Sequence, residues 1–203
     1  TEDIADMWIH EGFGTYAEGL FVECQQGEEA GARYIRGLRS GVSNDRPLIG
    51  PYGVNRKGSD EMYAKGANVL HTLRQVVDDD ALWRETLRGI QQTFRHDVVT
   101  SAEVEAYMAR MVGEDLAPYF DQYLRQRELP VLEYAVEGGR LHYRWVAAVE
   151  EFDMPVRVTL SPGQFEWIEP DADEWESVPT TLRSAADFQV DPDFFVVVRQ
   201  GRP

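Results

Sequence analysis

The first part of the chain, as far as Leu129, carries apolar residues at helical spacing. Between Met62 and Val77 they recur at steps of three and four residues, which places them on one face of an α-helix. Similar spacing occurs in the neighbouring segments, so the pattern predicts about six helices in this part of the chain. Besides 59–77, the predicted helical segments are 2–23, 28–40, 83–94, 100–111 and 118–124.

Capping residues locate several of these helix boundaries. Ser59 is followed by two acidic residues, the arrangement of an N-cap with acids in the first turn, where the helix dipole favours them. Thr100 has Glu103 three residues further on, which predicts a capping box at the start of a helix. Gly113 is the expected stop for that helix. Asp80 is the expected cap of the helix that contains Trp83.

The segment 41–58 is rich in glycine, proline and asparagine. It is long for a plain connection between two helices, and loops of this length often have a function. A surface crossover without any function is equally compatible with the sequence.

At Pro130 the spacing of apolar residues changes from helical to alternating. Residues 131–137 read as a strand, Gly138-Gly139 as a two-residue hairpin turn, and residues 141–149 as the returning strand. Further strand-like stretches separated by proline and glycine predict a small antiparallel β-sandwich. They are 156–160, 165–168 and 194–198. The expected fold class is therefore α+β in two segregated parts, with an all-α domain at 1–129 and a β-sandwich domain at 130–203.

Composition and charge exclude several classes of protein. The chain has 203 residues, of which 43% are hydrophobic and 11% aromatic, too many for a predominantly disordered chain. Its 20 basic and 36 acidic residues give a net charge of -16, which argues against nucleic acid as a partner because phosphate backbones repel a polyanion. No apolar run is long enough to span a membrane. The single cysteine, Cys24, excludes an internal disulfide and leaves the cellular compartment open.

The sequence contains none of the common short motifs for zinc binding, nucleophilic catalysis or phosphate binding. No two of the four histidines form the helical pair, four residues apart, that binds zinc in many peptidases. The stretch from His10 to Gly14 begins like that motif but has glycine where the second histidine would fall. There is no nucleophile elbow and no glycine-rich phosphate loop. Cys24 reads as a small apolar filler, and the acidic stretch 169–176 reads as a solvated turn because it lacks the pattern of a calcium loop.

Two longer motifs, in the right order, resemble one enzyme family. Residues 8–18, with the sequence WIHEGFGTYAE, resemble the Trp-Leu-Asn-Glu-Gly-Phe-Ala-x-Tyr-x-Glu helix of the M1 family of zinc aminopeptidases. Residues 62–67, MYAKGA, are similar to that family's Tyr-Glu-Lys-Gly-Ala block. The loop 47–52 and the helical run that ends at Leu124 follow the family's order as well. The resemblance spans residues 1 to about 130 and implies that a β-domain follows, as in many members.

The resemblance assigns roles to four residues. Glu11 falls on the third zinc ligand, the carboxylate that completes a site of two histidines and one glutamate. Tyr63 falls on the tyrosine whose hydroxyl donates to the oxyanion of the tetrahedral intermediate. Glu18, seven residues after Glu11 on the same helical face, either orients a zinc-bound histidine or forms an ordinary ion pair. His10 should point about 100° away from Glu11 around the helix, and is therefore expected to support the ligands from outside or to be structural.

The chain departs from the family pattern in lacking the His-Glu-x-x-His and Gly-x-Met-Glu-Asn motifs. The resemblance places both of them upstream of Thr1, in the same polypeptide, so we expect this chain to be the C-terminal portion of the catalytic domain plus the following β-domain. The longer parent would hold one zinc ion and hydrolyse N-terminal residues from peptide substrates. The isolated chain is expected to bind no catalytic zinc, to be inactive, and to expose an apolar surface where the missing zinc-binding helix would pack. Dimerisation or loss of order near residues 1–25 is the expected consequence.

Two alternatives from other functional classes remain open. Some relatives keep the peptidase scaffold without the metal site and act as protein-interaction modules, although the retention of both Glu11 and Tyr63 argues against that reading. The β-domain could also bind carbohydrate or protein through Trp167 and Trp175, although aromatic residues of a sandwich are usually core. Bacterial members are often exported, which favours the periplasm or the exterior over the cytoplasm as the compartment.

Overall fold

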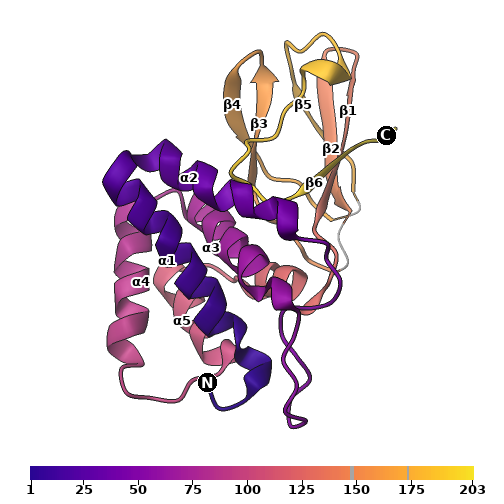
Figure 1. Cartoon of the computed structure of the whole chain (residues 1–203). Helices are drawn as coiled ribbons and strands as arrows, with labels where there is room; N and C mark the ends of the chain where they lie inside the picture. Colours follow the sequence, from indigo (N-terminus) through magenta and orange to yellow (C-terminus); the bar gives the residue numbers. More distant parts are fainter. Residues whose placement is uncertain (147–148, 173) are drawn as a thin grey trace. The chain divides into compact units, whose positions relative to one another are not determined.

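Helices and strands occupy different parts of the chain (Figure 1). The computed structural model describes all residues except 147–148 and 173. Residues Thr1–Arg127 form unit 1, which is helical, and residues Glu128–Pro203 form unit 2, which contains the strands. The predicted fold class, helices first and a small β structure second, is confirmed. The division lies two residues before the predicted one.

Unit 1 is built around one central helix, α3, in which every residue from Lys65 to Arg74 is buried. A helix that is buried on every side requires neighbours on several sides, and α1, α2 and α4 all contact it. The α-helices among the described residues are α1 (Trp8–Gln26), α2 (Glu28–Gly37), α3 (Ala64–Val77), α4 (Asp80–Thr93), α5 (Ser101–Val112) and α6 (Ala117–Phe120), accompanied by the short turns η1 (Ile4–Asp6), η2 (Leu38–Gly41), η3 (Asp60–Met62) and η4 (Asp121–Arg125).

The helix boundaries follow the capping chemistry with two differences. The capping box of Thr100 and Glu103 is present, and Gly113 ends α5 with a φ of 85°. Ser59 does accept from Glu61 N, but it caps the 3-10 turn η3, and the α-helix itself begins at Ala64. The expectation that Asp80 caps α4 is wrong. Asp79 has the extended backbone of an N-cap and accepts from the amides of Ala81 and Leu82, whereas Asp80 is already helical.

Unit 2 contains a four-stranded sheet of order β5-β2-β1-β6 and a separate two-stranded sheet, β3-β4. Gly138 and Gly139, with φ values of 60° and 74°, form the turn between β1 and β2, as their positive-φ preference predicts. One pair differs from the antiparallel expectation, since β6 runs parallel to β1. The strands are β1 (Val131–Glu137), β2 (Arg140–Val146), β3 (Val156–Ser161), β4 (Gln164–Ile168), β5 (Glu176–Pro179) and β6 (Val197–Gln200).

Three details of unit 2 depart from the sequence prediction. The acidic segment read as a turn ends in a strand, β5, because Glu176 begins the pairing with β2 opposite Tyr143. The last strand starts at Val197 rather than residue 194. Part of the predicted returning strand, 147–148, lies outside the described residues, and Val149 is in a bend.

The tryptophans of unit 2 divide between core and surface. Trp145 is fully buried and donates to Met154 O at 2.9 Å. Trp167 on β4 is 37% exposed, which differs from the expectation of a core position. Trp175 is partly covered by the guanidinium of Arg144, which lies 4.7 Å from the ring centroid.

No helix in the part of the chain that the structure describes is long and apolar enough to cross a membrane.

Candidate functional site

Helix α1 carries the residue that the sequence predicts as a metal ligand. Glu11 lies in the first turn of α1, where an acid interacts favourably with the helix dipole. It is half-buried, and within the described residues its carboxylate makes no hydrogen bond or ion pair. The two oxygens of Glu11 are therefore free to accept a ligand from outside this part of the chain.

The predicted oxyanion donor, Tyr63, lies where the turn η3 passes into α3. Its side chain is 45% exposed, unusually open for an aromatic residue next to a central helix. Within the described residues the Tyr63 hydroxyl has no hydrogen-bond partner. Tyr63 therefore presents a free donor at the start of α3.

A contact between two glycines sets how closely these two elements approach. A Cβ added to Gly66 of α3 would lie 2.9 Å from the Cα of Gly12 in α1, and one added to Gly12 would lie 3.3 Å from the Cα of Gly66. The two backbones thus touch without an intervening side chain. Gly12 follows Glu11 directly, and Gly66 lies one helical turn after Tyr63. The motif glycines therefore fix the spacing of the two helix segments that carry the candidate residues.

The other two predicted residues point to other neighbours. Glu18 is exposed and accepts a hydrogen bond of 2.5 Å from the hydroxyl of Tyr34 in α2, so its partner is a neutral donor and not the cation of the ion pair considered above. This bond to Glu18 raises the pKa of Tyr34. His10 is exposed, and its Nε2 lies 3.1 Å from the amino group of Thr1. Within the described residues, neither Glu18 nor His10 contacts Glu11 through a hydrogen bond.

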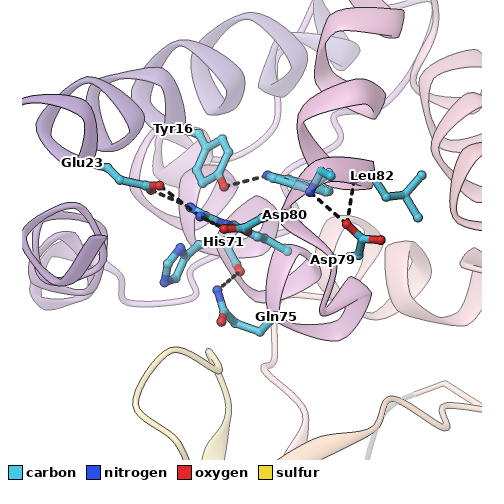
Figure 2. A network of polar contacts seen from close by, with 10 residues as sticks. Tyr16, Glu23, His71, Gln75, Asp79, Asp80 and Leu82 are labelled. Carbon is cyan, nitrogen blue, oxygen red and sulfur yellow. Dashed lines mark hydrogen bonds and ion pairs between the residues drawn. The ribbon is translucent and has the colours of Figure 1, made fainter. Parts of the chain in front are cut away.

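An ion cluster around the buried Arg74, which the sequence analysis did not identify, holds α1, α3 and α4 together (Figure 2). The guanidinium of Arg74 donates two bonds to Asp80, at 2.7 and 2.9 Å, and two to Glu23, at 2.6 and 3.0 Å. These hydrogen bonds, first that to Asp80, raise the pKa of Arg74 and lower that of Asp80. Asp80 lies only six positions from Arg74, but Glu23 lies 51 positions away, so no local motif could have indicated the whole cluster.

Beside this cluster, Tyr16 of α1 accepts a hydrogen bond of 2.9 Å from the indole of Trp83 in α4. Burial raises the pKa of the Tyr16 hydroxyl to about 12, so it stays protonated at neutral pH. A pocket of about 480 Å³ opens next to it. Since every nitrogen of the Arg74 guanidinium already has a carboxylate partner, the arrangement stabilises helix packing rather than acid–base chemistry.

The described residues do not complete a metal centre by themselves. No group of three or more histidine, cysteine, aspartate or glutamate side chains placed to hold a metal ion occurs among them. A catalytic zinc takes three protein ligands and keeps a fourth position for water. Glu11 fits one of the three positions by its chemistry and its free carboxylate.

Comparison with solved structures identifies the fold. A mutant of a two-domain M1 zinc metallopeptidase bound to L-tryptophan matches 63% of this chain at 29% identity with a TM-score of 0.53. This chain resembles the M1 zinc metallopeptidases. The M1 zinc metallopeptidase of Deinococcus radiodurans matches 63% of the chain at 27% identity, also with a TM-score of 0.53. No family model and no curated protein matches the sequence.

A third neighbour covers both units. Legionella pneumophila aminopeptidase A in complex with aspartic acid matches 99% of this chain with a TM-score of 0.66, at 12% identity, so this likeness concerns the fold alone. The chain spans 29%, 24% and 29% of the lengths of these three neighbours. The likeness in fold to this aminopeptidase thus extends over both the helical unit and the β unit.

Proposed function

We propose that this chain is part of the catalytic region of a zinc-dependent aminopeptidase, in which Glu11 is one of three metal ligands and Tyr63 is the oxyanion donor. The observation that carries the proposal is the contact between Gly12 and Gly66, which holds two free functional groups on adjoining helix segments. The likeness to M1 zinc metallopeptidases at 29% and 27% identity supports it. The activity belongs to the longer polypeptide and not to this chain alone.

The two residues have separate tasks in this proposal. The Glu11 carboxylate, half-buried and without a competing partner, holds the metal together with two histidines supplied by another part of the polypeptide. Bound zinc would polarise the scissile carbonyl and lower the pKa of its water. The free hydroxyl of Tyr63 donates to the oxygen on which negative charge develops, a contact worth about 2.7–4 kcal/mol in a dry site.

The exposed face of α1 is where we place the missing part of the polypeptide. Phe21 is 66% exposed and Tyr34 of α2 is 37% exposed, more than is usual for aromatic side chains on packed helices. Between them lies a pocket of about 460 Å³, lined also by the small residues Gly14 and Ala17. Small residues on a helix allow another helix to approach closely, so this face fits a helical segment that carries the missing His-Glu-x-x-His motif.

The proposal is tested on the longer polypeptide that contains this chain. We expect one zinc ion per molecule and hydrolysis of an aminoacyl 4-nitroanilide. Glu11→Gln should abolish stoichiometric zinc binding, because the amide loses the negative charge that the ligand position needs. Tyr63→Phe should keep the zinc and lower kcat by about two orders of magnitude. This chain by itself should bind no stoichiometric zinc and show no turnover.

Matched variants make these results specific. Glu114→Gln changes an exposed acid after α5, and Tyr134→Phe removes a tyrosine hydroxyl in unit 2; both should leave zinc content and kcat unchanged. Full zinc occupancy in Glu11→Gln would remove Glu11 from the ligand set. Unchanged kcat in Tyr63→Phe would remove Tyr63 from the reaction. A longer polypeptide without zinc or turnover would instead point to a non-catalytic scaffold.

A further inference from the structure

The glycine- and proline-rich segment 42–58, which we call the clasp, is fastened at its far end to the residues that precede α1. Gly50 N donates to Ala5 O at 3.1 Å, and Gly53 N donates to a carboxylate oxygen of Asp3 at 2.7 Å. The hydroxyl of Tyr52 donates to Asp6 Oδ1 at 2.6 Å. A long loop held by three bonds to one short segment is a defined structural element rather than a free connection.

The central anchor, Asp6, is fully buried and connects three elements. Its Oδ1 accepts from Tyr52 and also from Ser101 Oγ at 2.5 Å, at the start of α5. Ser101 in turn accepts from the indole of Trp8 in α1 at 2.8 Å. Asp6 Oδ2 is buried without a hydrogen-bond partner. The buried carboxylate therefore depends on two hydroxyl donors at a single oxygen, and the loss of either leaves it poorly satisfied.

The other end of the clasp is fastened to the turn that leads into Tyr63. Glu61 accepts from Ser43 N, Ser43 Oγ and Asn44 N at 2.5, 2.7 and 3.0 Å. Ser59 N donates to Pro47 O at 2.9 Å, and Ser59 Oγ donates to Asp45. Residues 59–62 are thus held by the clasp and not only by α3.

The two arms of the clasp, residues 47–50 and residues 56–58, are packed too closely to move separately. A Cβ added to Gly58 would lie 1.9 Å from Leu48 O, and one added to Gly50 would lie 2.4 Å from Arg56 O. Leu48 itself is fully buried. Only glycine allows backbones to approach to this extent. A displacement at the Tyr52 end must therefore be transmitted to the end that holds Ser59 and Glu61.

We propose that the clasp is a positioning device that couples the Tyr52–Asp6 hydrogen bond to the turn carrying Tyr63, so that loss of this bond loosens Tyr63 at the start of α3. Tyr52 is then a positioning residue, and its side chain, 54% exposed, makes the coupling accessible from outside. Burial and the bond to Asp6 raise the pKa of Tyr52 to about 12, so the donor proton is present throughout the neutral range. The consequence for turnover rests on the proposed function, whereas the mechanical coupling does not.

The test is amide hydrogen exchange on this chain with Tyr52→Phe. The reporters are the amides of Glu61 and Met62, which bond to Ser59, and the amide of Ala67, which donates to Tyr63 O at 3.0 Å. We expect exchange at these three amides to accelerate at least tenfold, although none of them touches Tyr52. The amides of α4 should exchange at the unchanged rate, which separates a local effect from global unfolding.

Tyr34→Phe is the matched control, since it also removes a tyrosine–carboxylate bond at the surface but lies outside the clasp. It should leave the three reporter amides unchanged. Acceleration confined to residues 50–55 in Tyr52→Phe would overturn the proposal, as would equal acceleration in both variants. Because the readout needs no peptidase activity, a failure of the proposed function would not affect this result.

Discussion

Each unit contains a buried ion held by two more exposed partners of opposite charge, and the sign of the central charge differs between the two units. In unit 1, Arg74 is 9% exposed and binds Glu23 and Asp80, whose side chains are 25% and 56% exposed. In unit 2, Glu133 is 11% exposed and accepts from Arg144 and Arg199, whose side chains are 27% and 53% exposed. Water can replace an outer partner far more readily than it can replace the central ion. Loss of the central ion should therefore cost far more stability than loss of one outer partner.

The largest effect is expected for Arg74→Met in unit 1. Removal of the guanidinium leaves Glu23 and Asp80 side by side without a cation, and the partly hydrated position of Asp80 moderates the cost. We expect unit 1 to lose about 3 kcal/mol. Hydrogen exchange of the α3 amides, measured against the β1 amides of unit 2, gives this value.

The control for that variant is Arg199→Met in unit 2, which should cost about 0.5 kcal/mol because Glu133 keeps Arg144 and solvent. Equal losses in the two variants would contradict the comparison.

A smaller effect is expected for Gly66→Ala, which places a methyl group 2.9 Å from the Gly12 Cα. The backbones of α1 and α3 must separate, and overpacking of this kind costs about 1–3 kcal/mol. Gly37→Ala is the matched variant, since Gly37 is helical at a φ of -59° and has open space around it. There we expect a gain of about 0.5 kcal/mol. Urea unfolding measures both, and a stabilised Gly66→Ala would refute the close contact.

The smallest effect concerns how the stability of unit 2 depends on pH. Burial, then the negative charge of Asp171, raise the pKa of Glu176, so folded unit 2 binds this proton more readily than the unfolded chain. Its contribution to stability increases as pH falls through the raised folded pKa, and the increase ends near the unfolded value of about 4.3. Glu176→Gln should remove this increase and raise stability at pH 7 by about 0.5 kcal/mol.

The pKa of Glu133 is shifted in the opposite direction to that of Glu176, which provides an internal control. Burial raises the pKa of Glu133, but the hydrogen bonds from Arg144 and Arg199 outweigh it and lower the pKa. Its stabilisation is present above the unfolded value of about 4.3 and is lost as pH falls below it. Unit 2 of Glu176→Gln should therefore still lose stability in that acidic range, and a stability curve that is flat there would contradict the assignment.

Local signals predicted the parts of the fold that depend on neighbouring residues. The capping box at Thr100 and the hairpin glycines Gly138 and Gly139 act within a few positions, and the structure has both. The choice between Asp79 and Asp80 could not be made, because Arg74 attracts Asp80 away from a capping role. Strand β5 was missed because its pairing with β2, and not its acidic composition, makes it a strand.

The candidate site was accessible from sequence only through the resemblance. Glu11 and Tyr63 are 52 positions apart, and nothing local relates them. Their roles stay predictions, while the contact of the adjacent glycines supplies a physical reason for the close approach of the two helix segments. Asp6 could not be recognised as an anchor, since its partner Ser101 lies 95 positions away.

The pairing of β6 with β1 has a consequence for the order in which the chain acquires its structure. β1 is the first strand of unit 2 and β6 is the last. One edge of β1 therefore has no partner strand until the whole of the intervening sequence has been synthesised. Such a long-range pairing forms slowly. On the ribosome, the helices can assemble while β1 still has one free edge, and that edge is the segment most in need of protection until synthesis has passed Gln200.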